Sequence, residues 1–387
     1  MAGEIQPDLV SIRRHLHQYP ELSFNELETS NFISGKLHSY GIENQKRMAG
    51  TGIVSAIEGR SKDKTIALRA DIDALPIMEQ NEVPYKSKSD GIMHACGHDV
   101  HTACLIGASV ILNKLRTRLP GSVRLIFQPG EEKLPGGASM LISEGVLKNP
   151  VPHAIFGQHV HPPLQTGKAG VKPGVYMASA DEIYVTVRGE GGHAAMPDEC
   201  IDPILIASNL IQTLQQIVSR HAPPTIPTVL TFGKIWSVGG ATNIIPGEVK
   251  LEGTFRTLDE EWRSKAHKLI RTIAEQTIKA QGAACDLEIV KGYPFLDNDT
   301  LLTARFRRYA EAFLGEENVV ELPVRMTAED FAYYSHQVPS CFYRLGTGNI
   351  EKGITSPLHT PTFDVDERCL EIGAGLLAWV AIQEMQT

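Results

Sequence analysis

The chain has 387 residues, of which 42% are hydrophobic and 21% are charged, and its formal net charge is −8. This composition is that of a globular protein of roughly two or three domains and excludes disordered and collagen-like chains, while the excess of 45 acidic over 37 basic residues argues against a nucleic-acid partner. The 14 histidines and 6 cysteines are the unusual feature, because they are unevenly distributed along the chain.

The beginning of the chain shows no targeting segment. Residues 1–7 contain neither the basic nor the apolar run of a signal peptide. No apolar stretch reaches the roughly 18 residues that are needed to span a membrane. The six cysteines are scattered, which predicts free thiols in a reducing compartment. We therefore expect a cytoplasmic protein without a membrane partner.

Helical and β-rich patterns alternate in the first part of the chain. Leu9, Ile12 and Leu16 recur at the spacing of one helix face. The elements predicted next are a helix at about residues 26–40, a strand at 65–68, a helix at about 102–115, and strands at 123–127 and 154–156. Short apolar strands that alternate with helices predict an α/β domain with a mostly parallel sheet.

The middle of the chain has a different order of elements. The predicted elements are a strand at residues 183–188, a helix from Asp202-Pro203 to about 219, strands at 228–238 and 248–257, a helix at 260–280 and a strand at 285–290. This β-α-β-β-α-β order is typical of a ferredoxin-like module. We expect it to be inserted, as residues 181–293, into an α/β domain formed by residues 1–180 and 294–387.

The last part returns to α/β character, with a predicted strand at residues 341–345 and a predicted helix at about 366–384.

Side chains of metal-binding types follow the predicted strands of the α/β domain. They are Asp71 and Asp73 after the first strand, Glu131 and Glu132 after the second, His159 and His161 after the third, and His94, Cys96, His98 and His101 in the loop before the helix at 102–115. Residues beyond the carboxyl ends of parallel strands share one edge of the sheet. Thiolate, imidazole and carboxylate together suit zinc or another borderline divalent ion.

The adjacent pair Glu131-Glu132 is informative about chemistry. Neighbouring side chains point in different directions, so that one carboxylate can bind a metal while the other remains available as a general base. Each motif taken alone also has a structural interpretation: a buried thiol, a solvated turn, a helix cap or a loop histidine at His193. If these structural interpretations all held, metal-binding side chains would follow each predicted strand by chance. One shared metal site is the more economical explanation.

The motifs resemble those of the dinuclear metallo-aminoacylase and carboxypeptidase superfamily, and more closely the amidohydrolase subgroup of hippurate hydrolases and indole-acetyl-amino-acid hydrolases. The resemblance covers essentially the whole chain. It rests on Arg13-Arg14-His15-Leu16-His17, Pro20-Glu21-Leu22-Ser23-Phe24, Arg69-Ala70-Asp71-Ile72-Asp73, His94-Ala95-Cys96-Gly97-His98-Asp99, Gln128-Pro129-Gly130-Glu131-Glu132, Gly192-His193-Ala194, Asn243-Ile244-Ile245-Pro246, Gly253-Thr254-Phe255-Arg256 and Ala328-Glu329-Asp330-Phe331.

The resemblance implies five ligands for two divalent ions, which are Zn, Mn, Co or Ni: Cys96, His98, Glu132, His159 and His359. It selects His359, which no spacing singles out, and we expect Cys96 to bridge the ions. The general base corresponds to Glu131. Asp71 is implied as a catalytic residue that orients a ligand imidazole, and Asp73 is the rival for that role.

The resemblance also makes the inserted module a lid that joins two or four copies of the chain into a homodimer or homotetramer. His193 corresponds to a lid histidine that polarises the scissile carbonyl. Asn243 and Arg256 fall on lid positions suited to holding the substrate carboxylate.

The implied activity is hydrolysis of the amide bond of N-acyl amino acids, with release of a carboxylic acid and a free amino acid. A dipeptidase or carboxypeptidase, or an N-acetyl-diaminopimelate deacetylase, is the alternative within the superfamily. A binding protein with a structural zinc is the alternative from another class, and Glu131 argues against it, because a structural site has no use for an additional carboxylate.

Overall fold

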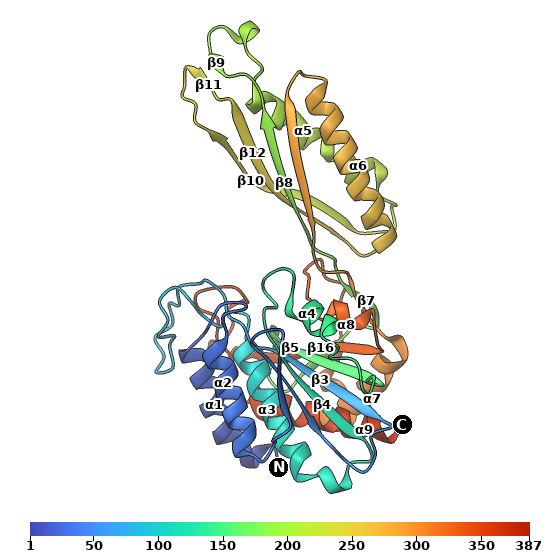
Figure 1. The fold of residues 1–387 in the computed structure, drawn as a ribbon. Coiled ribbons are helices and arrows are strands. Elements are labelled where there is room, and N and C mark those ends of the chain that lie inside the picture. The colour runs from blue at the N-terminus through green and yellow to red at the C-terminus, as the bar shows by residue number, and fades with distance from the viewer. The chain divides into compact units, whose positions relative to one another are not determined.

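The computed structural model describes residues 1–387, and the chain forms two compact units (Figure 1). The first unit is discontinuous and consists of Met1–Tyr176, Asp297–Val324 and Asp330–Thr387. The second consists of Met177–Leu296 with the short segment Arg325–Glu329. None of the helices is long and apolar enough to cross a membrane.

The first unit is built on an eight-stranded sheet with the order β1-β2-β4-β3-β5-β16-β6-β15. Its strands are β1 (Gln45–Met48), β2 (Gly52–Ile57), β3 (Thr65–Asp71), β4 (Ser122–Gln128), β5 (Ala154–Gln165), β6 (Ala169–Val171), β15 (Val319–Glu321) and β16 (Ser340–Gly348). The central neighbours β4, β3, β5 and β16 all run parallel, and antiparallel pairs lie toward the edges. The predicted mostly parallel α/β domain is thereby confirmed.

The helices of this unit bury apolar faces against the sheet and against one another. They are α1 (Gln6–Gln18), α2 (Leu27–Ser39), α3 (His98–Lys114), α4 (Gly137–Ser143), α7 (Thr300–Leu314), α8 (Ala332–Ser335) and α9 (Cys369–Gln386). Helix α3 is buried from His98 to Leu112 and packs against α1 and α9. The predicted face Leu9, Ile12 and Leu16 of α1 is buried in the core.

The second unit has the ferredoxin-like order expected from the sequence. Strands β8 (Asp181–Arg188), β10 (Thr228–Val238), β12 (Glu248–Thr257) and β13 (Ala284–Lys291) form an antiparallel sheet in the order β10-β12-β8-β13, with helices α5 (Pro203–Leu214) and α6 (Glu260–Lys279). A separate small hairpin pairs β9 (Gly192–His193) with β11 (Ile244–Ile245). Strands β7 (Gly174–Met177) and β14 (Leu296–Asn298) pair with each other.

Three predicted elements differ from the structure by more than three residues at one end. The strand predicted at 154–156 continues to Gln165, because it pairs in parallel with β16 far beyond Phe156. The helix predicted from residue 102 begins already at His98. The helix predicted to about residue 219 ends at Leu214 and is followed by a π-helical turn, Ile217–His221. The first two differences move predicted metal ligands from loops onto regular elements.

Candidate metal centre

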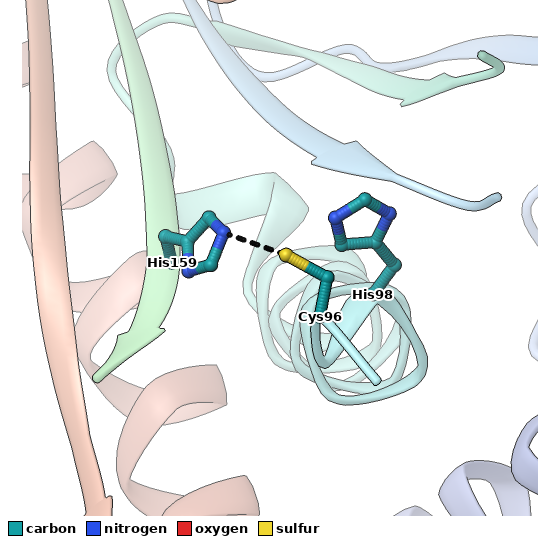
Figure 2. Close-up of side chains that lie close together, drawn as sticks. All are labelled: Cys96, His98 and His159. Atoms are coloured by element: carbon teal, nitrogen blue, oxygen red, sulfur yellow. Dashed lines mark hydrogen bonds between the residues drawn. The ribbon is translucent and has the colours of Figure 1, made fainter. Parts of the chain in front are cut away.

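Two short segments of the first unit bring Cys96, His98 and His159 together (Figure 2). Cys96 and His98 flank Gly97, which precedes α3 and has a left-handed φ of 82°. A Cβ atom on Gly97 would lie 2.5 Å from Cγ2 of Val160 in β5, so the close approach of this strand also requires glycine. The turn at Gly97 therefore places the Cys96 thiol against the His159 ring.

His359 reaches the same place from a distant part of the chain. Its backbone N–H donates to the carbonyl of Ala95 at 2.9 Å, which ties its loop to the segment that carries Cys96. Its φ of 60° is unusual for a residue other than glycine, and such conformations are concentrated at functional sites. The sequence carries no local signal for this arrangement, and only the family resemblance pointed to His359.

The five predicted ligands form one cluster. Sγ of Cys96 lies 3.4 Å from Nε2 of His159 and 3.3 Å from Nε2 of His359. Oε1 of Glu132 lies 3.4 Å from Nε2 of His359 and 3.9 Å from Nε2 of His98. All of these donor atoms thus converge on one small volume.

The second nitrogen of two rings is occupied, which fixes the orientation of those rings. Nδ1 of His98 donates to Oδ1 of Asp73 at 3.0 Å, and Nδ1 of His159 donates to the carbonyl of Val160 at 2.8 Å. In the neutral form of each ring, Nε2 therefore carries a lone pair that points into the cluster. Nε2 of His98 and Oε1 of Glu132 are buried and have no hydrogen-bond partner. Buried acceptors without a donor fit a bound cation.

The donor atoms divide into two groups that share the thiol. Cys96, His98 and His159 form one group of potential ligands, and Cys96, Glu132 and His359 form another. Within each group, the atoms lie within 4.8 Å of one another. The arrangement fits two divalent ions with the sulfur of Cys96 between them, and the mixed sulfur, nitrogen and oxygen donors suit borderline metals.

The electrostatics of the cluster also favour a cation. Burial raises the pKa of the Cys96 thiol, and the nearby Glu132 and Glu131 raise it further. Burial lowers the pKa of His98, but Asp71 and Asp73 outweigh this effect and raise it to about 10. A divalent cation would offset this negative charge and stabilise the deprotonated thiol and imidazole that can bind it.

Asp71 was expected to hold a ligand imidazole, but the hydrogen bond to His98 is made by Asp73, the rival residue. Asp73 accepts from His98, whereas the nearest oxygen of Asp71 is 3.7 Å from Nε2 of His98. Asp71 accepts from Nδ1 of His101 at 2.5 Å and from Arg69 at 2.6 Å. The Asp-x-Asp pattern marked both carboxylates but did not show which one faces the ligand histidine.

His101 is close to the cluster but is already fully bonded. Its Nδ1 donates to Asp71, and its Nε2 accepts from the backbone N–H of Val160 at 2.9 Å. With both nitrogens used, His101 has no lone pair for a metal.

Glu131 lies beside the predicted ligands. It forms a group with His98 and Glu132 whose donor atoms lie within 4.8 Å of one another. Its side chain is largely buried, and Oε1 accepts from the backbone N–H of Asp330 at 3.4 Å. A carboxylate in this position is near enough to exchange a proton with a water molecule held at the cluster.

The three predicted substrate-facing residues lie in the second unit. His193 and Asn243 meet in the small hairpin, where the Asn243 carbonyl accepts from the backbone N–H of Ala194 at 3.1 Å. Strand β12 begins at Glu248, shortly after Asn243 in the chain. Arg256 lies near the carboxyl end of this strand, eight residues after Glu248 and thus about 26 Å along it. Burial lowers the pKa of Arg256. Within this unit, the structure brings His193 and Asn243 together but not Arg256.

Residues 67–383 match the model of Peptidase family M20/M25/M40. The chain belongs to this family. It is 41% identical to the N-acetyl-L-cysteine deacetylase of Bacillus subtilis over 95% of this chain and 85% of the relative. It is 38% identical to thermostable carboxypeptidase 2 of Saccharolobus solfataricus over 98% of this chain and 96% of the relative.

A solved structure of the M20 family supports the same assignment. The YXEP protein of Bacillus subtilis, described as a dinuclear metal binding peptidase, is 36% identical with a TM-score of 0.84, over 100% of this chain and 99% of that one. The M20 chain described here is therefore a metal-dependent amidohydrolase, as its motifs predicted.

Proposed function

We propose that this M20 hydrolase cleaves the amide bond of N-acyl amino acids with the help of two divalent ions. The ligands are Cys96, His98, Glu132, His159 and His359. The observation that carries the proposal is the convergence of these donors, with two of their buried acceptor atoms unpartnered and Glu131 beside them. A site of this composition can hold both a water molecule and a carbonyl oxygen.

Bound divalent ions would polarise the scissile carbonyl and lower the pKa of a water molecule. Glu131 accepts the proton of that water and passes it to the leaving nitrogen. Asp73 keeps the ring of His98 in place through its hydrogen bond to Nδ1. Asp71 acts less directly: it holds His101, which accepts from the N–H of Val160, and the carbonyl of the same residue orients His159.

The second unit supplies the groups that recognise the rest of the substrate. His193 stabilises the developing negative charge on the carbonyl oxygen. Asn243 and Arg256 hold the substrate carboxylate, for which a guanidinium is well suited. Support for these roles comes from the family motifs in which the three residues stand.

The metal is Zn, Mn, Co or Ni, because thiolate, imidazole and carboxylate donors accommodate all four ions.

The protein acts in the cytoplasm. This location is supported by the six cysteines, which are all free thiols.

Two or four copies associate through the second unit. Support comes from the apolar side chains that this unit exposes, with Leu205 on α5 65% exposed and Ile235 on the edge strand β10 50% exposed.

An activity panel tests the proposal. Metal-free protein would be loaded with Zn, Mn, Co or Ni in turn and assayed against N-acetyl and N-benzoyl amino acids and against dipeptides. We expect the highest kcat/KM on an N-acyl amino acid. Equal or higher kcat/KM on dipeptides would favour the carboxypeptidase activity named for one relative. No turnover of either class would favour a binding protein.

A further inference from the structure

The segment between α1 and α2 runs beside the turn that carries Glu131 and Glu132. It is anchored to the chain after β3, because Leu22 bridges to Ala74 and the Ala74 N–H donates to the carbonyl of Glu21 at 2.8 Å. The segment contains the family motif Pro20-Glu21-Leu22-Ser23-Phe24. Its contacts show that it does more than connect two helices.

Glu26 in this segment is fully buried and bonds directly to the turn. Its Oε1 accepts from the backbone N–H of Gly130 at 2.8 Å, and its Oε2 accepts from Oγ1 of Thr51 at 2.6 Å. Glu26 precedes α2, yet its side chain makes no capping bond to that helix. Burying a carboxylate is costly, and here it secures the backbone N–H of the residue before Glu131.

Two neighbours of Glu26 hold the same region. Phe24 has a left-handed φ of 68°, and its ring occupies the space beside Gly130, where a Cβ atom would lie 2.2 Å from Cε1 of Phe24. Oγ of Ser23 donates to Oδ2 of Asp73 at 2.6 Å, and the same oxygen accepts from the Glu132 N–H at 3.0 Å. The turn is therefore fixed on both sides of Glu131.

We propose that Glu26 is a positioning residue that sets the place of Glu131 and Glu132 by holding the Gly130 peptide. Its effect on turnover rests on the proposed amide hydrolysis, and its effect on metal binding rests on the proposed ligand role of Glu132. Loss of Glu26 frees the Gly130 N–H and lets the turn move away from the cluster. Partners of this kind contribute about 10- to 100-fold to metal affinity or activity.

The test compares Glu26→Met, Glu26→Gln and a matched control, Glu21→Ala. Methionine keeps the volume but removes the acceptor, whereas glutamine keeps an acceptor oxygen for Gly130. Glu21 is a carboxylate of the same segment that accepts from the backbone of Thr29 at 2.8 Å and makes no contact with the turn. Each variant would be titrated with Co²⁺ by calorimetry and by its visible absorption, and kcat and KM would be measured separately.

We expect Glu26→Met to weaken the binding of one of two Co²⁺ ions by about 10- to 100-fold and to lower kcat more than it raises KM. Glu26→Gln should retain most of the Co²⁺ affinity and of kcat, and Glu21→Ala should change neither of these two quantities. Thr51→Val, which removes one donor to Glu26, should shift Co²⁺ affinity less and in the same direction, and it serves if Glu26→Met does not fold.

Unchanged Co²⁺ affinity in Glu26→Met, or in Thr51→Val if Glu26→Met does not fold, would overturn the inference, as would an equal loss in Glu21→Ala. If the wild-type protein binds two Co²⁺ ions with this dependence on Glu26 but hydrolyses no amide, the proposed function fails and the positioning role stands.

Discussion

Glu131 and Glu132 are adjacent in the chain but differ in what surrounds them. Glu132 has an oxygen 3.4 Å from His359, the distance of a neighbour within one ligand set, whereas Glu131 is paired with the backbone of Asp330. This difference supports the proposal that Glu132 is a metal ligand and Glu131 the general base.

Replacing Glu131 by glutamine tests that division. The amide keeps the shape of the side chain but cannot take up a proton at neutral pH, so kcat should fall by about 10²- to 10⁴-fold. Metal content, measured by mass spectrometry of the purified protein, should stay close to that of the wild type. Near-normal turnover would remove Glu131 from the role of general base.

Asp73 and Asp71 provide a second comparison between single residues. Asp73→Asn should weaken metal binding by about 10- to 100-fold, because the amide accepts less strongly from Nδ1 of His98. Asp71→Asn should have a smaller effect, because Asp71 forms its hydrogen bond with His101 rather than with a predicted ligand. Competition with a metal-sensitive dye measures both affinities, and a larger effect of Asp71→Asn would reverse the assignment made from the hydrogen bonds.

At the scale of elements, the sequence located most helices and strands but not their exact limits. The alternation of strand and helix was readable from local apolar spacing, whereas the length of β5 depends on its pairing with β16, nearly 200 residues later. Helix α7 was not predicted, although Asp299 caps it and Leu302, Phe306 and Ala310 mark its buried face. The sequence could not reveal the position of His359, because that depends on contacts between distant loops.

Buried polar side chains join helix α1 to the site-bearing elements, and Arg13 reaches two of these elements. Arg13 is fully buried and bonds to Asp99 at 2.8 Å, in the first turn of α3, and to Asp364 at 3.0 Å, in the loop after His359. The guanidinium thus links the two parts of the chain that carry His98 and His359.

Removal of this guanidinium should destabilise the fold. Arg13→Met leaves buried Asp99 without its main cationic partner and should lower the free energy of unfolding by about 3–5 kcal/mol. Arg14→Ala removes the neighbouring but exposed ion pair with Glu367 and should cost less than about 1 kcal/mol. Urea denaturation of both variants measures the difference, and similar losses would show that burial of the Arg13 network does not matter.

At the scale of the whole molecule, the second unit has the features of an independent domain. Its core is a separate apolar cluster between its sheet and the helices α5 and α6. A buried ion pair joins Arg263 to Asp181 at the start of β8, and Asp181 also bonds to His267 at 2.6 Å and to the Gly292 N–H at 3.1 Å. These contacts fix the two ends of the inserted segment to each other.

We therefore expect residues 177–296 to fold when they are produced alone. Circular dichroism should show helix and strand with a cooperative thermal transition.

Burial raises the pKa of Asp181, but His267 and Arg263 outweigh this effect and hold the pKa below its usual value. A lowered folded-state pKa contributes stability above the usual carboxyl pKa of about 3.9, and this contribution is lost as the pH falls further. The transition temperature should decline below about pH 4, and less so in Asp181→Asn.

The discontinuity of the first unit has a consequence for synthesis on the ribosome. Strand β5 lies between β3 and β16, and the residues of β16 emerge only after the whole second unit has been made. All four strands of the main sheet of the second unit lie in one continuous stretch, Met177–Leu296, which can fold as soon as it leaves the exit tunnel. Until Ser340–Gly348 appears, one edge of β5 has no partner, and an unpaired strand edge of this kind is a template on which another chain can pair.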